Sequence, residues 1–313
     1  MAEHLSEIVL MSRIARAYYL EGQSRVDIAA QLGISRFRVA RMLVTARESG
    51  IVHIEIRSPG MVNTDLSIDL ENKYGLTRAI VLDVAADALP TLRGQLGRAA
   101  GQLLTEVVDE GDYIGLSWAR SLAHISDGVD HLVKCSVVQM TGALSDPQGS
   151  DVLELVRQLA RLGGGPAHVF YAPMVVDDTA MAKSLRRQPE VARALGLVDS
   201  VSVALVGLGS WRPGQSTIYD SLSRADREQH TRRGIVAEVS GVLVDAEGQP
   251  RETPLSRRTI CPTGAQMQAI PNVVAVGYGA QKAQGINSVL SGTLVNTLIT
   301  HTGLAQALLD LDD

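Results

Sequence analysis

Three arginines lie close together near the N-terminus: Arg36, Arg38 and Arg41. The forked guanidinium of arginine can hydrogen-bond O6 and N7 of guanine together, or bind a phosphate. Ser35 precedes them and can cap a helix, so Arg36, Phe37 and Arg38 fall on an exposed first turn, where a helix meets the major groove of DNA. We predict that Ser35, Arg36, Phe37, Arg38 and Arg41 contact DNA. The alternative is a helix with a solvated arginine face.

The stretch that holds these residues, 24–46, predicts two short helices joined by a tight turn. Ser24 and Asp27 have the spacing of a capping box at the start of the first helix. Gly33 suits the turn, because a residue there often needs a positive φ that costs glycine little. The second helix carries an apolar stripe of Val39, Met42, Leu43 and Ala46. With an earlier helix over 5–21, this is the outline of a helix-turn-helix.

The sequence after this hairpin predicts a strand and then a domain boundary. Residues 51–57, IVHIEIR, alternate apolar and polar side chains, as in a strand that forms a small wing or a link. Ser58-Pro59-Gly60 is typical of a linker. We therefore predict two domains, 1–57 and 61–313. Residues 1–57 have a net charge of +2 and the rest a net charge of −7, so the first domain is the basic one.

The remaining sequence alternates between helical and strand-like segments, which indicates an α/β domain with a mostly parallel sheet. Helices are expected over 66–73, 91–108, 120–131, 151–162, 180–195 and 282–309. Strands are expected over 79–83, 113–118, 135–141, 202–208, 235–244 and 273–278. In such sheets a ligand binds at the carboxyl ends of the strands, where loops lead into helices.

The first candidate binding loop is GDYIGLSWARSL, residues 111–122. Backbone N–H groups at a helix start, the hydroxyls of Ser117 and Ser121 and the charge of Arg120 together predict an anion site. Trp118 offers an apolar face that suits a sugar ring, and Ala119 completes the loop. The alternative is an ordinary strand-to-helix turn with a solvated Arg120.

Two further loops and one strand carry candidate ligand-binding residues. Gly207, Gly209 and Trp211 follow a strand, but their GxG lacks the third glycine of a dinucleotide-binding motif. Lys282 opposes the dipole of the helix that it starts, so either it faces a bound anion or it is solvated. Glu238 lies in the apolar or small run IVAEVSG, and it is either at a wet strand edge or hydrogen-bonded, for instance to a polyhydroxylated ligand.

Several functional classes leave no signature in the sequence. There is no signal peptide and no apolar run long enough for a membrane helix, which predicts a cytoplasmic protein with no membrane partner. Cys135 and Cys261 lack metal-ligand or redox spacing, so we expect buried thiols. There is no nucleophile elbow, P-loop or HExxH motif. We therefore predict no catalytic residues, no metal and no cofactor.

The segment SRVDIAAQLGISRFRVARMLVTARESGIVHIEI resembles the head of the SorC family of sugar-responsive bacterial transcriptional regulators. The family pattern there runs through I-A-x-x-L-x-I-S-R, V-x-R-x-L and A-R-x-x-G-I-V. The resemblance continues through 76–82, GDYIGLSWARSL, 137–142, 171–173, VGLG at 206–209, GIVAEVSGVLVDAEG at 234–248 and VGYGAQKAQGINSVLSGTLVNTLIT at 276–300. It implies a winged helix-turn-helix domain, followed by a Rossmann-like effector-binding and oligomerisation domain similar to sugar-phosphate isomerases.

The resemblance implies a homodimer or homotetramer that binds the operator of a carbohydrate-utilisation operon and responds to a sugar, sugar alcohol or sugar phosphate. In members that take a phosphorylated sugar, the phosphate lies on the loop matching 117–122, near the lysine matching Lys282, and the acid matching Glu238 contacts ligand hydroxyls. Gln139, within the matching segment 137–142, joins the candidate effector contacts.

Two departures from the family pattern leave an unphosphorylated ligand open. Ala119 stands where the family often has glycine, and Thr300, His301 and Thr302 replace a common Thr-Asp-Glu. A sugar-phosphate isomerase-like enzyme with an accessory DNA-binding head is the alternative function.

Overall fold

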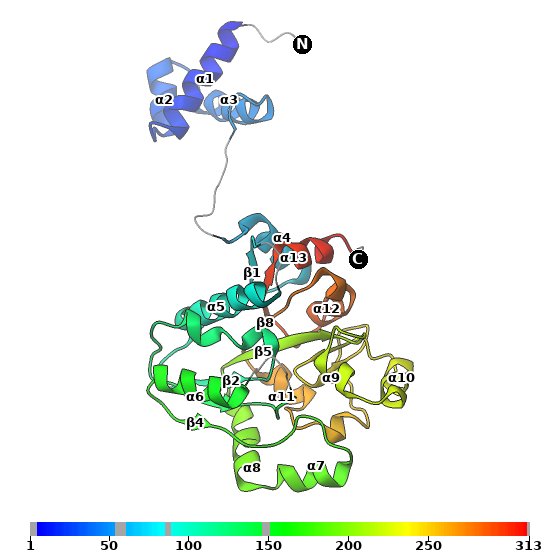
Figure 1. Ribbon diagram of the computed structural model, residues 1–313. Helices are drawn as coiled ribbons and strands as arrows, with labels where there is room; N and C mark the ends of the chain where they lie inside the picture. The colour runs from blue at the N-terminus through cyan, green and yellow to red at the C-terminus, as the bar shows by residue number, and fades with distance from the viewer. Residues whose placement is uncertain (1–4, 54–60, 85–88, 146–150, 312–313) are drawn as a thin grey trace. The chain divides into compact units, whose positions relative to one another are not determined.

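The computed structural model describes residues 5–53, 61–84, 89–145 and 151–311. The chain separates into two units, 1–57 and 58–313 (Figure 1). Each unit has its own hydrophobic core, and each is described by itself below.

The N-terminal unit consists of α1 (Leu5–Tyr19), α2 (Arg25–Leu32) and α3 (Arg36–Glu48). All three helices contribute to its core, which includes Met11, Ile14, Ala15, Ile28, Ala29, Val39, Met42, Leu43 and Ala46. Ser24 Oγ accepts a hydrogen bond from Asp27 N at the start of α2, and Gly33 ends α2 with a φ of 64°. Ser35 Oγ accepts from Arg38 N at 3.2 Å and so caps α3. The exposed face of α3 is therefore fixed by its cap and its buried stripe.

The strand expected over 51–57 is not found in its described part. Residues 51–53 are irregular, and Val52 N donates to Ala46 O at 2.8 Å, which turns the chain back on the end of α3. Residues 54–57 and the expected linker at 58–60 lie outside the described residues.

The C-terminal unit is built on a parallel sheet with the strand order β1-β9-β8-β5-β2-β3-β4. These strands are β1 (Arg78–Leu82), β9 (Thr297–His301), β8 (Asn272–Val276), β5 (Val203–Ser210), β2 (Tyr113–Leu116), β3 (Ser136–Gln139) and β4 (Ala167–His168). The last residues of β5 also pair antiparallel with β6 (Ala237–Val239), which pairs with β7 (Val242–Val244). The expected mixed α/β fold with a parallel sheet is confirmed.

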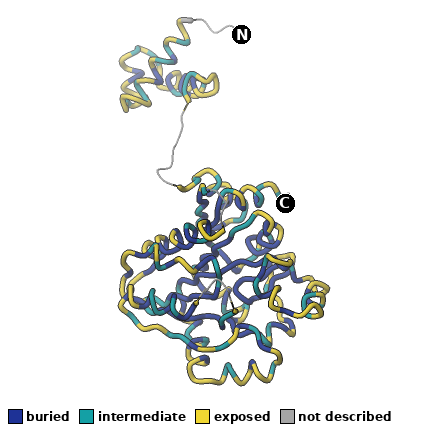
Figure 2. The backbone as a smooth tube through the Cα atoms, viewed as in Figure 1, coloured by how far each residue is buried: buried dark blue, intermediate teal, exposed yellow. Residues whose placement is uncertain are grey.

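Helices cover both faces of the sheet, and alternate strand residues supply two cores. Side chains such as Leu116, Leu205 and Val274 pack with α5 (Leu89–Val107) and α6 (Val152–Leu162). Their neighbours in the strands pack on the other face, against residues of α4 (Thr64–Tyr74), α7 (Thr179–Arg186), α8 (Pro189–Gly196), α11 (Gly264–Ala269), α12 (Ala283–Ser291) and α13 (Thr302–Leu309). Figure 2 shows this buried centre in dark blue, between helices whose outer sides are exposed.

The single helix expected over 282–309 is two helices in the structure, with a strand between them. α12 ends at Ser291, β9 then enters the sheet between β1 and β8, and α13 begins at Thr302. Every residue of β9 is buried between β1 and β8. The sequence of β9, Thr-Leu-Ile-Thr-His, is short and has no strict alternation, and periodicity alone does not separate such a buried strand from a helix.

Three other expected elements are divided in the structure. The helix expected over 120–131 is replaced by two short 3-10 helices, η1 (Arg120–Leu122) and η2 (Ile125–Gly128). The helix over 180–195 is broken before Pro189, the first residue of α8. The strand over 235–244 is the β6–β7 hairpin, which turns at Ser240 and Gly241 with positive φ at both.

Shorter elements complete the described part of the chain. They are α9 (Thr217–Ser221), α10 (Arg224–Arg232), η3 (Leu197–Ser200), η4 (Ser256–Arg258) and η5 (Ala280–Lys282). None of the helices in the described ranges is both long and apolar enough to cross a membrane.

Candidate functional site

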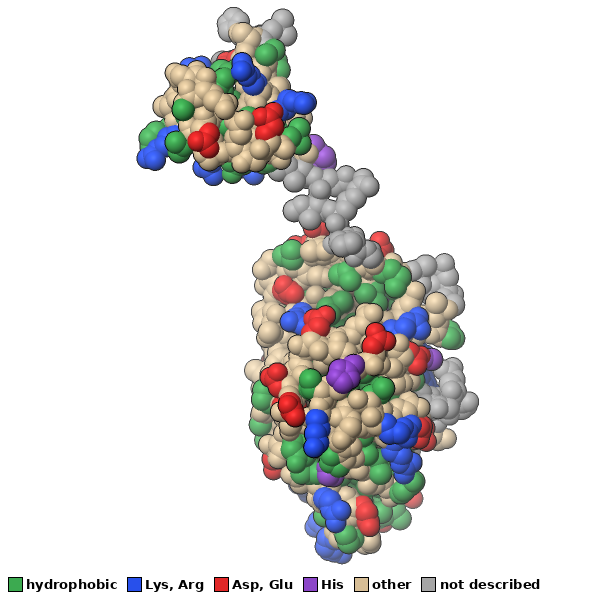
Figure 3. Space-filling view, turned by 90° about the vertical axis from the view of Figure 1, so that its left-hand side faces the viewer, with side chains coloured by type: hydrophobic (Ala, Val, Ile, Leu, Met, Phe, Trp, Pro, Cys, Tyr) green, Lys and Arg blue, Asp and Glu red, His purple; other side chains and the backbone are tan. Residues whose placement is uncertain are grey.

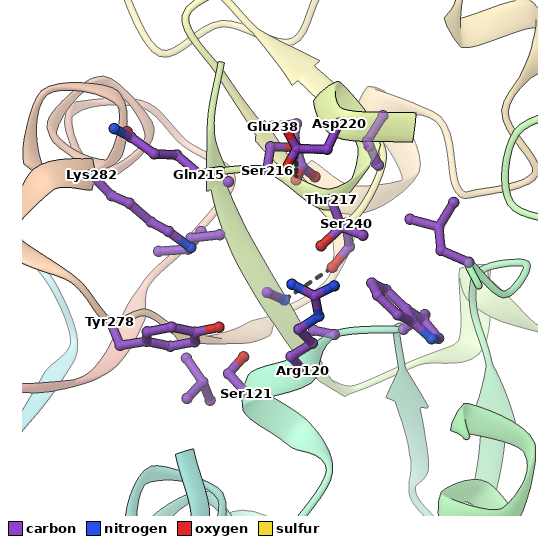
Figure 4. A pocket seen from close by; sticks show the side chains of 18 of the residues that line it. Arg120, Ser121, Gln215, Ser216, Thr217, Asp220, Glu238, Ser240, Tyr278 and Lys282 are labelled. Carbon is purple, nitrogen blue, oxygen red and sulfur yellow. Dashed lines mark hydrogen bonds between the residues drawn. The ribbon is translucent and has the colours of Figure 1, made fainter. Parts of the chain in front are cut away.

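The loops after β2 and β5 lie where the order in which the chain adds strands to the sheet reverses. From β2 the chain continues outward to β3 and β4, whereas from β5 it continues to β8 and β9 on the opposite side. Loops at such a switch point diverge above and below the sheet and leave a crevice between them. A cavity of about 120 Å³ lies here, and Figure 4 shows it from close by.

The structure brings eight of the eleven expected effector contacts to this cavity. They are Trp118, Ala119, Arg120, Ser121, Gly207, Gly209, Glu238 and Lys282. They come from segments up to 164 positions apart in the sequence, from position 118 to position 282. Their convergence follows from parallel strands that present their carboxyl ends at one edge.

Three expected contacts, Gln139, Trp211 and Ser117, do not line the cavity, and all three are buried elsewhere in the unit. Gln139 is fully buried, where its amide donates to Thr141 O at 2.9 Å and accepts from Phe170 N at 3.1 Å. Trp211 packs edge-on against Tyr219, with ring centres 5.3 Å apart. Ser117 is buried and lines a separate, smaller hollow together with residues of α6.

Glu238 is a buried carboxylate held by two donors. Ser216 Oγ donates to its Oε1 at 3.0 Å, and Gly241 N donates to its Oε2 at 3.1 Å. It lies opposite Gly209 in the β5–β6 pair, where a Cβ would overlap the carboxylate. Burial raises the pKa of Glu238, while the two hydrogen bonds and Lys282 act to lower it. Glycine at 209 is thus needed to make room for this acid.

Lys282 is the matching buried cation, with only 9% of its surface exposed. It ends η5 and directly precedes α12, and its ammonium lies 4.6 Å from the centre of the Tyr278 ring. Burial, with smaller contributions from Arg93 and Arg120, lowers the pKa of Lys282 to about 8, although Glu238 acts to raise it. An additional negative charge in the cavity would therefore raise the pKa of Lys282 and favour its protonated form.

Arg93 of α5 completes a cluster of cations that sequence reasoning missed. Its Nε donates to the Tyr278 hydroxyl at 2.9 Å, and its guanidinium lies 5.1 Å from the centre of the same ring. Tyr278 thus contacts both Arg93 and Lys282. Nothing in the sequence around Arg93 marks it, because its place in the site depends on packing between α5 and the loop after β8.

The anion site expected at the start of a helix is built differently. Arg120 begins η1, which has three residues and so lacks the dipole of a full helix. A Cβ on Gly207 would come within 2.5 Å of the Ala119 Cβ, so the Ala119 methyl occupies room that the glycine leaves. In the structure, charge on this side of the cavity comes from the Arg120 side chain.

Ser240 and the segment around α9 form the remaining wall, which sequence reasoning also missed. Ser240 has an unusual φ of 48°, and its Oγ accepts from Gly207 N at 3.0 Å (Figure 4). Gln215, Ser216, Thr217 and Asp220 add polar groups from the other side. The feature that marks Ser240 is its positive φ, which is visible only in the folded chain, so the sequence does not point to this residue.

This arrangement suits the binding of a polar, charged small molecule. Arg93, Arg120 and Lys282 supply positive charge, and Glu238 and Asp220 supply negative charge. Within the described ranges no group of three or more His, Cys, Asp or Glu side chains has the geometry to hold a metal ion. The fold and the cavity together define an α/β small-molecule-binding unit, joined in one chain to a small helical unit.

Comparison with known proteins identifies the family. The family described as "Putative sugar-binding domain" matches residues 60–310. The chain is 28% identical to the transcriptional regulator LsrR of Klebsiella pneumoniae subsp. pneumoniae, over 98% of this chain and 94% of the relative. It is 26% identical to the sorbitol operon regulator of Klebsiella pneumoniae, over 98% and 99% respectively.

The fold agrees with this relationship. The crystal structure of the full-length sorbitol operon regulator SorC from Klebsiella pneumoniae aligns with a TM-score of 0.73 at 24% identity, over 97% of this chain and 100% of that one. The chain belongs to this sugar-binding family, and it is a transcriptional regulator of the SorC type, as the sequence resemblance predicts.

Proposed function

We propose that the protein binds operator DNA of a carbohydrate-utilisation operon in the cytoplasm, and that a sugar with an anionic group controls this binding. The observation that carries the proposal is the buried pair of Glu238 and Lys282 at the switch point of the sheet, with two arginines beside it. The effector acts by a population shift: it binds one arrangement of the protein better than another and so changes operator affinity.

The N-terminal unit is the proposed DNA-binding domain. α2, the turn at Gly33 and α3 follow each other as in a helix-turn-helix, and Arg36, Arg38 and Arg41 are exposed on α3. Figure 3 shows basic side chains on the surface of this unit. α3 is therefore the proposed recognition helix, with Ser35 fixing its start.

A matched pair of substitutions tests the role of α3. Arg38→Ala is expected to weaken operator binding about tenfold, by the loss of one contact to a base or phosphate worth ~1–3 kcal/mol. Effector binding is expected to stay unchanged. Arg224→Ala removes the same charge from the other unit, at a side chain that is 90% exposed, and serves as the control. Equal loss of DNA and effector binding in Arg38→Ala contradicts the assignment.

The effector is proposed to carry a phosphate or carboxylate as well as hydroxyl groups. A neutral sugar leaves three cationic side chains around the cavity against two carboxylates. An anion near Lys282 balances that charge and favours the protonated amine, whose pKa burial lowers to about 8. The Glu238 carboxylate keeps lone pairs beyond its two hydrogen bonds, and these can accept from sugar hydroxyls.

A thermal-shift screen tests this proposal with the full-length protein. The ligands are matched sets of a sugar, its alcohol, its phosphate and its sugar acid. A ligand at a hundred times its Kd stabilises the native state by about 2.7 kcal/mol. We expect only anionic members to raise the Tm, and Lys282→Met to abolish the shift. Lys134→Met, at an exposed lysine outside the cavity, is the control. A shift by the neutral sugar alone contradicts the anionic class.

Self-association as a homodimer or homotetramer belongs to the same proposal. Two recognition helices in a dimer read paired half-sites, which raises both affinity and specificity. Light scattering coupled to gel filtration measures the mass directly, and a monomer at micromolar concentration contradicts it.

An isomerase-like activity is the second candidate, because a buried acid and a lysine with shifted pKa values in one cavity are also typical of catalytic sites. We propose that the protein is not an enzyme. Full-length protein incubated with pentose and hexose phosphates is expected to show no turnover, and product formation that Glu238→Gln abolishes contradicts this.

A further inference from the structure

Phe37 is the most exposed aromatic side chain of the N-terminal unit. The chain has two phenylalanines, and the other, Phe170, is 1% exposed whereas Phe37 is 70% exposed. An apolar ring of this size is normally buried, and leaving it in water forgoes its contribution to stability. Its exposure on a small unit with a complete core indicates that the ring contacts something other than this unit.

The surroundings of Phe37 indicate that the partner is anionic. Arg36 lies with its guanidinium 5.0 Å from the centre of the ring, and Arg38 and Arg41 are exposed on the same helix. Arg41 is one turn from Phe37, so the two share one side of α3. The buried residues Val39, Met42, Leu43 and Ala46 lie on the other side. A purely apolar partner would bury these charges without compensation.

Duplex DNA offers an apolar target inside an anionic surface. Among the unmodified bases, only thymine places a methyl group in the major groove, at its C5 position. Phe37 is the second residue of α3, in the turn that a recognition helix presents to base edges. We propose that Phe37 packs against a thymine C5-methyl group and specifies thymine at that position of the operator half-site.

The role of the neighbouring arginine follows from the same geometry. Arg36 stacked near the ring restricts both side chains, so less conformational entropy is lost when they enter the groove. The inference rests on the proposed DNA-binding function, and it names the base that this helix reads.

The experiment begins with selection of DNA sequences from a random duplex pool by the full-length protein. Each thymine of the selected half-site is then replaced in turn by deoxyuridine, which removes only the methyl group. Burial of one methyl group corresponds to about a fourfold change in affinity. We expect one thymine per half-site whose replacement weakens binding by about this factor.

A cycle with Phe37→Ala assigns the effect to the ring. The variant is expected to bind the thymine duplex more weakly, and to bind the thymine and uracil duplexes equally well. Val26→Ala, at another exposed apolar residue (62%), is the control and should retain the fourfold difference. Because Phe37 is exposed, its removal should leave the melting temperature of the protein nearly unchanged, which a thermal scan checks.

The outcomes separate this inference from the function on which it rests. If no sequence is enriched, the proposed operator binding itself fails. If a sequence is enriched but no uracil weakens binding, or if the uracil effect persists in Phe37→Ala, the thymine contact is overturned. A loss of self-association in Phe37→Ala, with unchanged uracil sensitivity, would show that the ring packs against a second copy of the chain instead.

Discussion

Moving one methyl group from position 119 to position 207, which both line the cavity, should reveal how closely β5 packs against the segment that follows β2. Gly207 is in β5 and Ala119 follows β2, and a Cβ on Gly207 would lie 2.5 Å from the Ala119 Cβ. Carbon atoms in contact are about 3.5–4.0 Å apart, so Gly207→Ala forces the two segments apart by about 1 Å. Because β2 and β5 pair directly, neither backbone can move freely.

The expected cost of Gly207→Ala is about 1–3 kcal/mol, as for other overpacked cores. For a unit of this size each kcal/mol lowers the Tm by about 2–4 °C, which gives a fall of about 2–12 °C. Ala119→Gly removes the opposing methyl, and alone it is destabilising by about 1 kcal/mol through lost packing and greater chain flexibility. The double variant carries the methyl group on β5 and not on the segment after β2, and it should regain most of the stability lost in Gly207→Ala.

Urea unfolding of the wild type, both single variants and the double variant gives the coupling energy between the two sites. We expect a coupling of about 1–3 kcal/mol in favour of the double variant. If Gly207→Ala is as stable as the wild type, or if the double variant is less stable than either single variant, the close approach inferred from the structure is refuted. Ala99→Gly, at a buried residue of α5, controls for the cost of glycine alone.

Three further predictions follow from the buried titratable groups. Burial lowers the pKa of Lys282 to about 8, so the affinity for an anionic effector should fall between pH 7 and 9 in calorimetric titrations, and a flat profile contradicts this. Glu238→Ala should destabilise the protein by about 1–3 kcal/mol, because it leaves Gly241 N without an acceptor, whereas Glu238→Gln should cost much less; equal melting temperatures of the two variants argue against the contact. Burial also lowers the pKa of His301, which caps α13, so the unfolded state binds a proton more readily than the folded state. Stability in urea should therefore fall as the pH drops below about 6.5, and less so in His301→Asn.

Much of the fold could be predicted because apolar runs bounded by turns mark strands, and caps mark helices. The predicted strand over 79–83 and the predicted helix over 151–162 agree with β1 and α6 to within one residue at each end. Prediction failed where a short strand lies between two helices, as in 282–309, and where a short segment is held by contacts far along the chain. The 3-10 helix η2 is of the second kind, since Gly128 packs directly against the Arg98 backbone of α5.

The part of the candidate site that lies on loops after strands could be predicted from the sequence. Trp118 and Ser121 were found because they follow a strand whose carboxyl end lies at the switch point. Arg93 and Tyr278 were missed because their contact joins the second turn of α5 to a loop 185 positions later. Ser117 belongs to the same loop but does not line the cavity, and which residues of a loop face a cavity is set by backbone geometry that the sequence leaves open.

The charges of the cavity limit which ligands it can hold. With a neutral sugar, Lys282 and the two arginines would have only Glu238 and Asp220 as counter-charges, and burial already disfavours the ammonium of Lys282. An anion without hydroxyls would meet the Glu238 carboxylate, which accepts hydrogen bonds and offers none. A ligand with an anionic end and hydroxyl groups at the other satisfies both. Since η1 lacks the dipole of a full helix, we expect side-chain charge to recognise the anionic end of such a ligand. Because Lys282 is buried, salt should screen this interaction only partly, and effector affinity should weaken modestly as the salt concentration rises.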